Sequence, residues 1–137
     1  MANSVIPNCG ITHVALRAAD FERSLEFYKA IGFTVFRQWG TPESRIALLD
    51  SGDGTLIELF SKIQPGEPNG DAAGGYSHVA FHVDDVDAAF QRALNAGAKP
   101  KIEPKFVDIA SEPMLPVRLA FVYGPSGEQL EFFHILK

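Results

Sequence analysis

A chain of 137 residues, 46% of them hydrophobic, is long enough for one compact domain or for two small domains packed closely together. The formal net charge of −5 and the lack of a Lys/Arg run argue against a nucleic-acid-binding protein. A single cysteine, Cys9, excludes an internal disulfide, and no stretch resembles a membrane-spanning helix or a signal peptide, so we expect a cytoplasmic protein without a membrane partner.

The first part of the chain predicts a βαβββ module. Residues 11–17 alternate in polarity and begin with β-branched side chains, which is typical of a strand. Asp20 is suited to cap a helix whose apolar side chains recur at helical spacing, and Gly32 is suited to end it. Three further strands are predicted over residues 33–39, 45–50 and 55–60.

The second part predicts the same order of elements after a connecting segment. Residues 63–75 contain two Pro and four Gly, which is typical of a linker. This linker separates a first module, residues 1–62, from a second, residues 76–137, within one compact domain overall. In the second module we expect a strand, a helix and three strands over residues 77–83, 86–96, 99–108, 115–123 and 128–135. Its prolines, Pro104, Pro113 and Pro116, predict that the sixth and seventh strands of the chain are irregular or edge-like.

The two modules look like copies of each other. Residues 11–33 and 76–98 carry identical residues at five of 23 positions, with the second copy 65 residues after the first. The shared residues mark a strand, a helix start and a helix end. Residues 56–60 (LIELF) then match residues 129–133 (QLEFF). We therefore interpret the chain as a duplicated module.

Four polar residues interrupt the apolar strands at equivalent places: His13, Glu58, His78 and Glu131. An imidazole or carboxylate is costly to bury without a partner. Because side chains alternate across a strand, His13 shares a face with Ala15, and His78 shares a face with Ala80, while the valines beside them point to the helices. We expect all four polar side chains to point into one cleft.

A lone histidine or glutamate in a strand is usually hydrogen-bonded or close to solvent, and this remains the simpler interpretation for each residue alone. The set, repeated in the same frame, favours a divalent metal site. Two imidazoles and two carboxylates suit Zn or Ni, which we expect first, and also Fe, Mn or Co. Water in the remaining positions would leave such a site open for catalysis.

The chain resembles the vicinal-oxygen-chelate superfamily, which includes glyoxalase I, methylmalonyl-CoA epimerase, extradiol dioxygenases and bleomycin-resistance proteins. The resemblance rests on HVALRAADFERSLEFYKAIGF, SHVAFHVDDVDAAFQRALNAGA, LIELF and GPSGEQLEFF. The last motif is similar to the family ending DPxGxxxEL, with Gly124 in place of Asp. The resemblance implies an α+β fold in which two βαβββ modules form a curved, half-open barrel of mixed sheet with the helices outside.

The residue set His, Glu, His, Glu is similar to the metal ligands of glyoxalase I. The resemblance implies that Glu131 is both ligand and catalytic base, with Glu58 as its pseudo-symmetric partner. Arg17 matches an arginine that binds the glutathione carboxylate, or else is a structural cation at a strand end. Lys62 stands where glyoxalase I has Asn, so the substrate contact differs there.

The role of the remaining polar residues is left open by the sequence. His82 is the pseudo-symmetric mate of Arg17 and is either a supporting acid or base near the substrate, or a packed histidine. His134 lies on the face opposite Glu131 and receives no role. Exposed surface charge is the simpler interpretation of four cations, and an anionic tail of the substrate is the alternative ligand: Lys99, Lys101, Lys105 and Arg118.

Three functions fit these observations. The leading hypothesis is a glyoxalase I-like lyase or isomerase that removes a proton next to two metal-chelated oxygens of a small-molecule substrate. The alternatives are an epimerase or Fe(II) dioxygenase on the same scaffold, and a metal-free binding protein of the resistance type. The family resemblance implies a homodimer, in which the modules pair either within one chain or across the two chains.

Overall fold

The computed structural model describes residues 2–61 and 76–136, so the predicted linker 63–75 and Lys62 lie outside the described residues. Each half of the described chain has the order βαβββ, as the sequence predicts. The first module consists of β1 (His13–Arg17), α1 (Phe21–Ala30), β2 (Thr34–Thr41), β3 (Ser44–Asp50) and β4 (Leu56–Phe60). The second consists of β5 (Val79–His82), α2 (Val86–Asn95), β6 (Lys99–Ile109), β7 (Leu115–Tyr123) and β8 (Gln129–Ile135).

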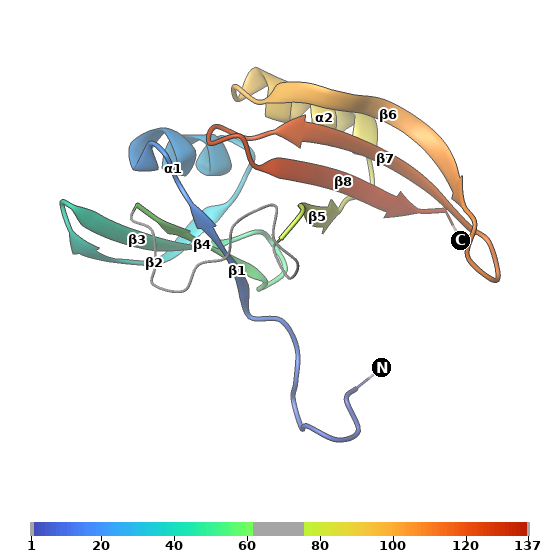
Figure 1. Cartoon of the computed structure of the whole chain (residues 1–137), viewed down its shortest axis with the longest axis horizontal. Coiled ribbons are helices and arrows are strands. Elements are labelled where there is room, and N and C mark those ends of the chain that lie inside the picture. Colours follow the sequence, from blue (N-terminus) through green and yellow to red (C-terminus); the bar gives the residue numbers. More distant parts are fainter. Residues whose placement is uncertain (1, 62–75, 137) are drawn as a thin grey trace.

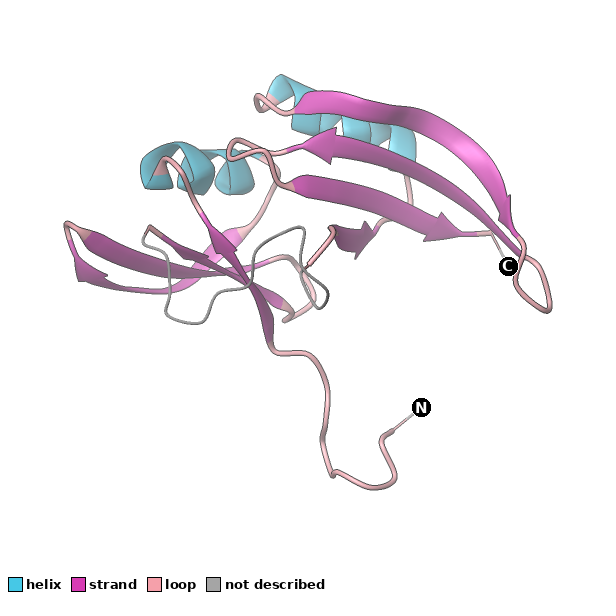
Figure 2. Cartoon of the chain, viewed as in Figure 1, coloured by secondary structure: helices cyan, strands magenta, loops and turns pink. Residues whose placement is uncertain are grey.

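Each module forms one four-stranded mixed sheet, and neither sheet closes into a barrel (Figures 1 and 2). The strand orders are β1-β4-β3-β2 and β5-β8-β7-β6, with the first pair parallel and the others antiparallel. The α+β fold of two βαβββ modules is therefore confirmed. The expectation of an edge strand with irregular pairing holds for β6, which has two register shifts, whereas β7 is internal and pairs regularly with β8.

The predicted helix boundaries follow from the same capping chemistry in both modules. The Asp20 carboxylate accepts a hydrogen bond from the Arg23 backbone N–H, and Asp85 does the same for Ala88. Beyond the helix ends, Gly32 and Gly97 have φ values of 101° and 110°, a left-handed conformation that favours glycine. These matching caps fix where each chain segment leaves its sheet and returns to it.

Side-chain alternation divides each sheet into a core face and a face that no described helix covers, called here the helix-free face. Leu16, Ile57 and Leu59 are buried on the core face of the first sheet, and Leu130 and Phe132 on that of the second. These side chains belong to one apolar cluster that includes residues of α1 and α2. Register places Ala15 opposite Glu58 and Ala80 opposite Glu131, on the helix-free faces. The predicted division of faces is thus confirmed.

The two modules pack through related contacts on their turns. The Ala19 backbone N–H donates to Ser126 Oγ at 2.9 Å, joining the β1–α1 junction to the turn before β8. His82 Nε2 lies 3.2 Å from Asp53 Oδ2, joining the end of β5 to the turn before β4. Between them the Phe33 and Phe81 rings meet edge to face, with centroids 5.4 Å apart. Each module is therefore held by the last turn and by the core face of the other module.

A buried tyrosine of α1 also holds the turn before β8 through a hydrogen bond. Tyr28 is fully buried, and its hydroxyl donates to Glu128 Oε2 at 2.7 Å. Burial, with the carboxylate beside it, raises the pKa of Tyr28 well above its usual value. A Cβ added to Gly124 would lie 2.5 Å from the Glu128 carboxyl carbon. Gly124, the departure from the family ending, thus leaves room for the carboxylate that Tyr28 binds.

We expect Tyr28→Phe to lower the free energy of unfolding by about 1–2 kcal/mol, because the half-buried Glu128 carboxylate would keep only the Ser126 backbone donor of the two described ones. Urea denaturation measures the change. Tyr123→Phe removes a hydroxyl from half-buried β7 and is expected to change stability by less than about 0.5 kcal/mol. Equal effects of the two substitutions would contradict this account of Tyr28.

Candidate metal centre

The first candidate pair is formed by His13 and Glu58 on the neighbouring parallel strands β1 and β4. His13 Nε2 lies 3.7 Å from Glu58 Oε1. The histidine side chain is 41% exposed and the glutamate 25%, so both can reach a ligand from the helix-free face. Small Ala15, opposite Glu58 in the register, leaves the space beside the pair open.

The second pair repeats this arrangement with a more deeply buried carboxylate. His78, which directly precedes β5, places Nε2 3.1 Å from Glu131 Oε1 on β8, and Glu131 is only 8% exposed in its side chain. The other ring nitrogen, Nδ1, lies 3.0 Å from Ser77 Oγ, and the ring meets Phe121 edge to face at 5.1 Å. Contacts of this kind orient the imidazole of a metal ligand.

Burial raises the pKa of Glu131 above its usual value, while the charge of His78 and the hydrogen bond to it act in the opposite direction. A raised pKa makes a carboxylate a stronger base. The side chain of Glu131 is 8% exposed and that of Glu58 25%, so the two glutamates are in different environments although they occupy equivalent strands.

The distances within each pair fit shared metal ligation. Two ligands bound at about 2.0–2.2 Å to one metal ion, with usual coordination angles, lie about 3.0–3.7 Å from each other. The nitrogen-to-oxygen distances of 3.1 Å and 3.7 Å fall in this range. Imidazole and carboxylate together are also the ligand types that Zn and the neighbouring transition metals accept. Each pair therefore fits half of the predicted ligand set.

The structure brings the residues together in pairs and does not bring all four to one point. Within residues 2–61 and 76–136, no three or more His, Cys, Asp and Glu side chains form a group that could hold a metal. Within these residues of one chain the four side chains therefore form two separate pairs, and a cleft shared by all four stays a prediction. The contacts between the modules are made by their last turns, by their core faces and by His82 at the end of β5.

The other predicted site residues lie at different distances from these pairs. Arg17 is on β1, on the helix-free face with His13 and Ala15, and is exposed. His82 binds Asp53 of the first module instead of either pair. Arg118 forms two 2.7 Å hydrogen bonds to Asp87, and these two residues are an ion pair at the surface. Asp53 and Phe121 were missed from the sequence, because only the register and the module packing bring them to their partners.

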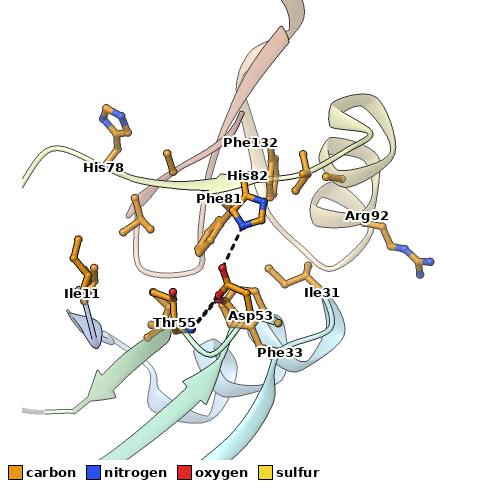
Figure 3. A pocket seen from close by; sticks show the side chains of 18 of the residues that line it. Ile11, Ile31, Phe33, Asp53, Thr55, His78, Phe81, His82, Arg92 and Phe132 are labelled. Carbon is orange, nitrogen blue, oxygen red and sulfur yellow. Dashed lines mark hydrogen bonds and ion pairs between the residues drawn. The ribbon is translucent and has the colours of Figure 1, made fainter. Parts of the chain in front are cut away.

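A cavity of about 690 Å³ lies between the modules, and its lining includes His78, Ala80 and His82 on the helix-free side of β5 (Figure 3). Its walls are mainly apolar and include Ile31, Phe33, Phe81 and Phe132, which come from the core sides of both modules. The His82–Asp53 contact spans its mouth (Figure 3). The Thr55 backbone N–H also donates to Asp53, and this bond, followed by the contact with His82, lowers the pKa of Asp53 to about 2.

These modules and pairs agree with the comparisons with known proteins. The family model of the Glyoxalase/Bleomycin resistance protein/Dioxygenase superfamily matches residues 10–132. The chain belongs to this superfamily. Superfamily members generally use a divalent metal, in keeping with the paired ligand types. No helix within the described ranges is long and apolar enough to cross a membrane.

Relatives of this chain are named for different enzyme activities. A lactoylglutathione lyase from Neisseria meningitidis is 30% identical over 130 residues, which covers 89% of this chain and 88% of the relative. A 2-epi-5-epi-valiolone epimerase from an Actinomyces species is 29% identical over 148 residues, covering 91% of this chain and 79% of the relative. A glyoxalase family protein from Enterococcus faecalis has a similar crystal structure, with a TM-score of 0.69, 26% identity and coverage of 90% and 96%.

We expect Asp53→Asn to destabilise the chain near neutral pH relative to the parent protein. The pKa of Asp53 is lower in the folded state than the usual value of about 3.9, so its stabilising effect is present above pH 4. That effect is lost as the pH falls toward 2, and the difference in thermal midpoint between the two proteins should shrink over this range. Asp108→Asn, on the exposed part of β6, is the control; a constant difference from pH 7 to pH 2 would contradict the prediction.

Proposed function

We propose that this protein is a metal-dependent lyase or isomerase of the glyoxalase I type. The observation that carries the proposal is the pair of His–Glu contacts at equivalent positions on the helix-free faces of two duplicated modules. The relative named lactoylglutathione lyase supports the reaction class. The proposed substrate is the hemithioacetal that forms from a 2-oxoaldehyde and a thiol such as glutathione.

The proposed active site is assembled across a homodimer. One pair offers one imidazole and one carboxylate, whereas a catalytic Zn or Ni site takes at least three protein ligands. In each chain β1 and β5 are sheet edges, and the helix-free face beside each edge carries one pair. A two-fold arrangement that set β1 of one protomer beside β5 of the other would join His13 and Glu58 with the partner's second pair.

The proposed chemistry uses the different environments of the two glutamates. Glu131, with its raised pKa, accepts the proton from the carbon that bears the hydroxyl and the sulfur. A bound divalent metal would supply the positive charge that stabilises the negative charge developing on the two neighbouring substrate oxygens. Glu131 then returns the proton to the adjacent carbon, the hydroxyl proton passes to the former carbonyl oxygen, and the product is a thioester of a 2-hydroxy acid. Glu58 would hold the opposite side of the site as the second carboxylate.

Epimerisation is the second candidate, supported by the relative named 2-epi-5-epi-valiolone epimerase. It requires the same proton removal next to an oxygen. The proton would then return to the opposite face of the same carbon, and the two glutamates on opposite modules are suited to such a two-base reaction. Product analysis separates the candidates, since only isomerisation of the hemithioacetal forms a thioester.

We expect Glu131→Gln to lower kcat for methylglyoxal and glutathione by about 10²–10⁴-fold, because an amide cannot accept the proton. Thioester formation measured by absorbance, with Zn and with Ni, provides the test. Glu103→Gln, which removes an exposed carboxylate from β6, should leave the rate unchanged. Metal content is measured for each protein, and full activity of metal-loaded Glu131→Gln would exclude the proposed base.

A mixture of two inactive variants tests whether the site crosses the dimer. When His13→Ala and His78→Ala chains are co-expressed, about half of the dimers contain one of each, and one of their two sites would keep all four ligands. We expect about a quarter of the parent's metal content and turnover, against almost none for either variant alone. If both pairs of one site came from the same chain, the mixture would stay as inactive as its components.

A further inference from the structure

A bulge in β6 changes the direction of one lysine side chain. Pro100 pairs with Val122 and Ile102 with Phe121, so the register with β7 shifts at Lys101 between them. An extra residue of this kind re-aims its side chain, and bulges are frequent beside active sites. Here Lys101 Nζ lies 5.0 Å from the centroid of the Phe121 ring and donates a hydrogen bond to Gln129 Oε1.

These contacts bring Lys101 to the same face as the second candidate pair. Phe121 is the register partner of Glu131, and its ring is in contact with the His78 ring. Gln129 precedes Glu131 by two residues on β8 and therefore points to the same face. The Phe121 ring thus contacts both the Lys101 ammonium and the ring of His78 in the second pair.

The charge of Lys101 is available for a ligand. Its partners among residues 2–61 and 76–136 are the Phe121 ring and the Gln129 amide, which are uncharged, whereas Arg118 on the adjacent strand is matched by Asp87. An ammonium group has three donors, and Gln129 uses one of them. In a chain with a net charge of −5, a local cation of this kind attracts an anion to this face.

The first module repeats the bulge but not the charge. Its register shift falls between Val35 and Arg37 on β2, and the residue between them is Phe36, 65 residues before Lys101. Phe36 is 49% exposed, and the Arg37 guanidinium stacks on its ring. Both modules therefore have a bulge in the strand that follows the helix, but the residue at the bulge differs. It is Phe36 in the first module and the cation Lys101 in the second.

We propose that Lys101 binds an anionic oxygen group of the substrate, a carboxylate or a phosphate, beside the Phe121 ring that also contacts His78 of the His78–Glu131 pair. This specificity role rests on the proposed function. It assigns to the substrate an oxyanion on the side of the second module, with its reacting carbon at Glu131. The Phe121 ring contacts both Lys101 and His78, so it favours an apolar or flat segment in the part of the substrate that joins the oxyanion to the reacting carbon.

The test measures binding to the full chain and needs no turnover. Phenylphosphonate and benzoate serve as anionic probes and benzyl alcohol as the uncharged match, with backbone NMR shifts recorded with and without Zn²⁺. The parent protein is expected to bind both anions, with shifts at residues 99–103, 121 and 129. Lys101→Met should weaken this binding about tenfold, Lys101→Arg should stay within about threefold, and benzyl alcohol should be unaffected. Lys29→Met, which removes the same charge from the last turn of α1, is the control.

Anion binding that is equal in the parent and in Lys101→Met, or shifts that map elsewhere, would overturn the proposal, as would a parent protein that binds neither anion. The result is separable from the proposed function. Lys101-dependent anion binding in a protein without metal or turnover would refute the lyase or isomerase alone. Normal turnover with an unchanged KM for an anionic substrate in Lys101→Met would refute the role of Lys101 alone.

Discussion

Side-chain alternation along the parallel strand pairs β1–β4 and β5–β8 is the constraint on which both the core and the candidate site depend. Ile57 and Leu59 are buried on one face, while Glu58 between them reaches the other. A shift of one residue in either register would exchange these faces. Burial of the aliphatic side chains therefore also fixes the position of each His–Glu pair, and the same apolar packing that stabilises the module orients its ligands.

Packing between the modules acts against assembly of the site within one chain. The turns before β4 and β8 each contact the strand-to-helix junction of the other module, and the core faces share one apolar cluster. This packing uses the core faces and the turns of both modules, and it does not include either His–Glu pair. The pairs remain exposed at the two sheets, where a second protomer can reach them. Separating the surfaces for folding and for ligation in this way makes the proposed function depend on association.

Local features were predictable from the sequence because they depend on residues close together in the chain. Asp20 and Asp85 cap their helices, and the His–Glu pairs face each other because strand parity alone decides the face. The module arrangement was not predictable in this way. Ala19 and Ser126 are 107 residues apart, and nothing in the turn sequences identifies them as partners. Equivalence in sequence does not specify that equivalent faces meet, so the sequence left open whether the four residues meet within one chain or across two chains.

The departures from exact duplication carry the information about the substrate. Both modules have a His–Glu pair, and both have a bulge in the strand that follows the helix. The two copies thus share the backbone geometry around the proposed metal ligands. The bulge residues, Phe36 and Lys101, differ in charge, and the two carboxylates differ in burial. A symmetric ligand would gain nothing from such differences. A substrate with one charged end and one proton-bearing carbon would be held in a single orientation, with that carbon at the glutamate whose burial favours protonation.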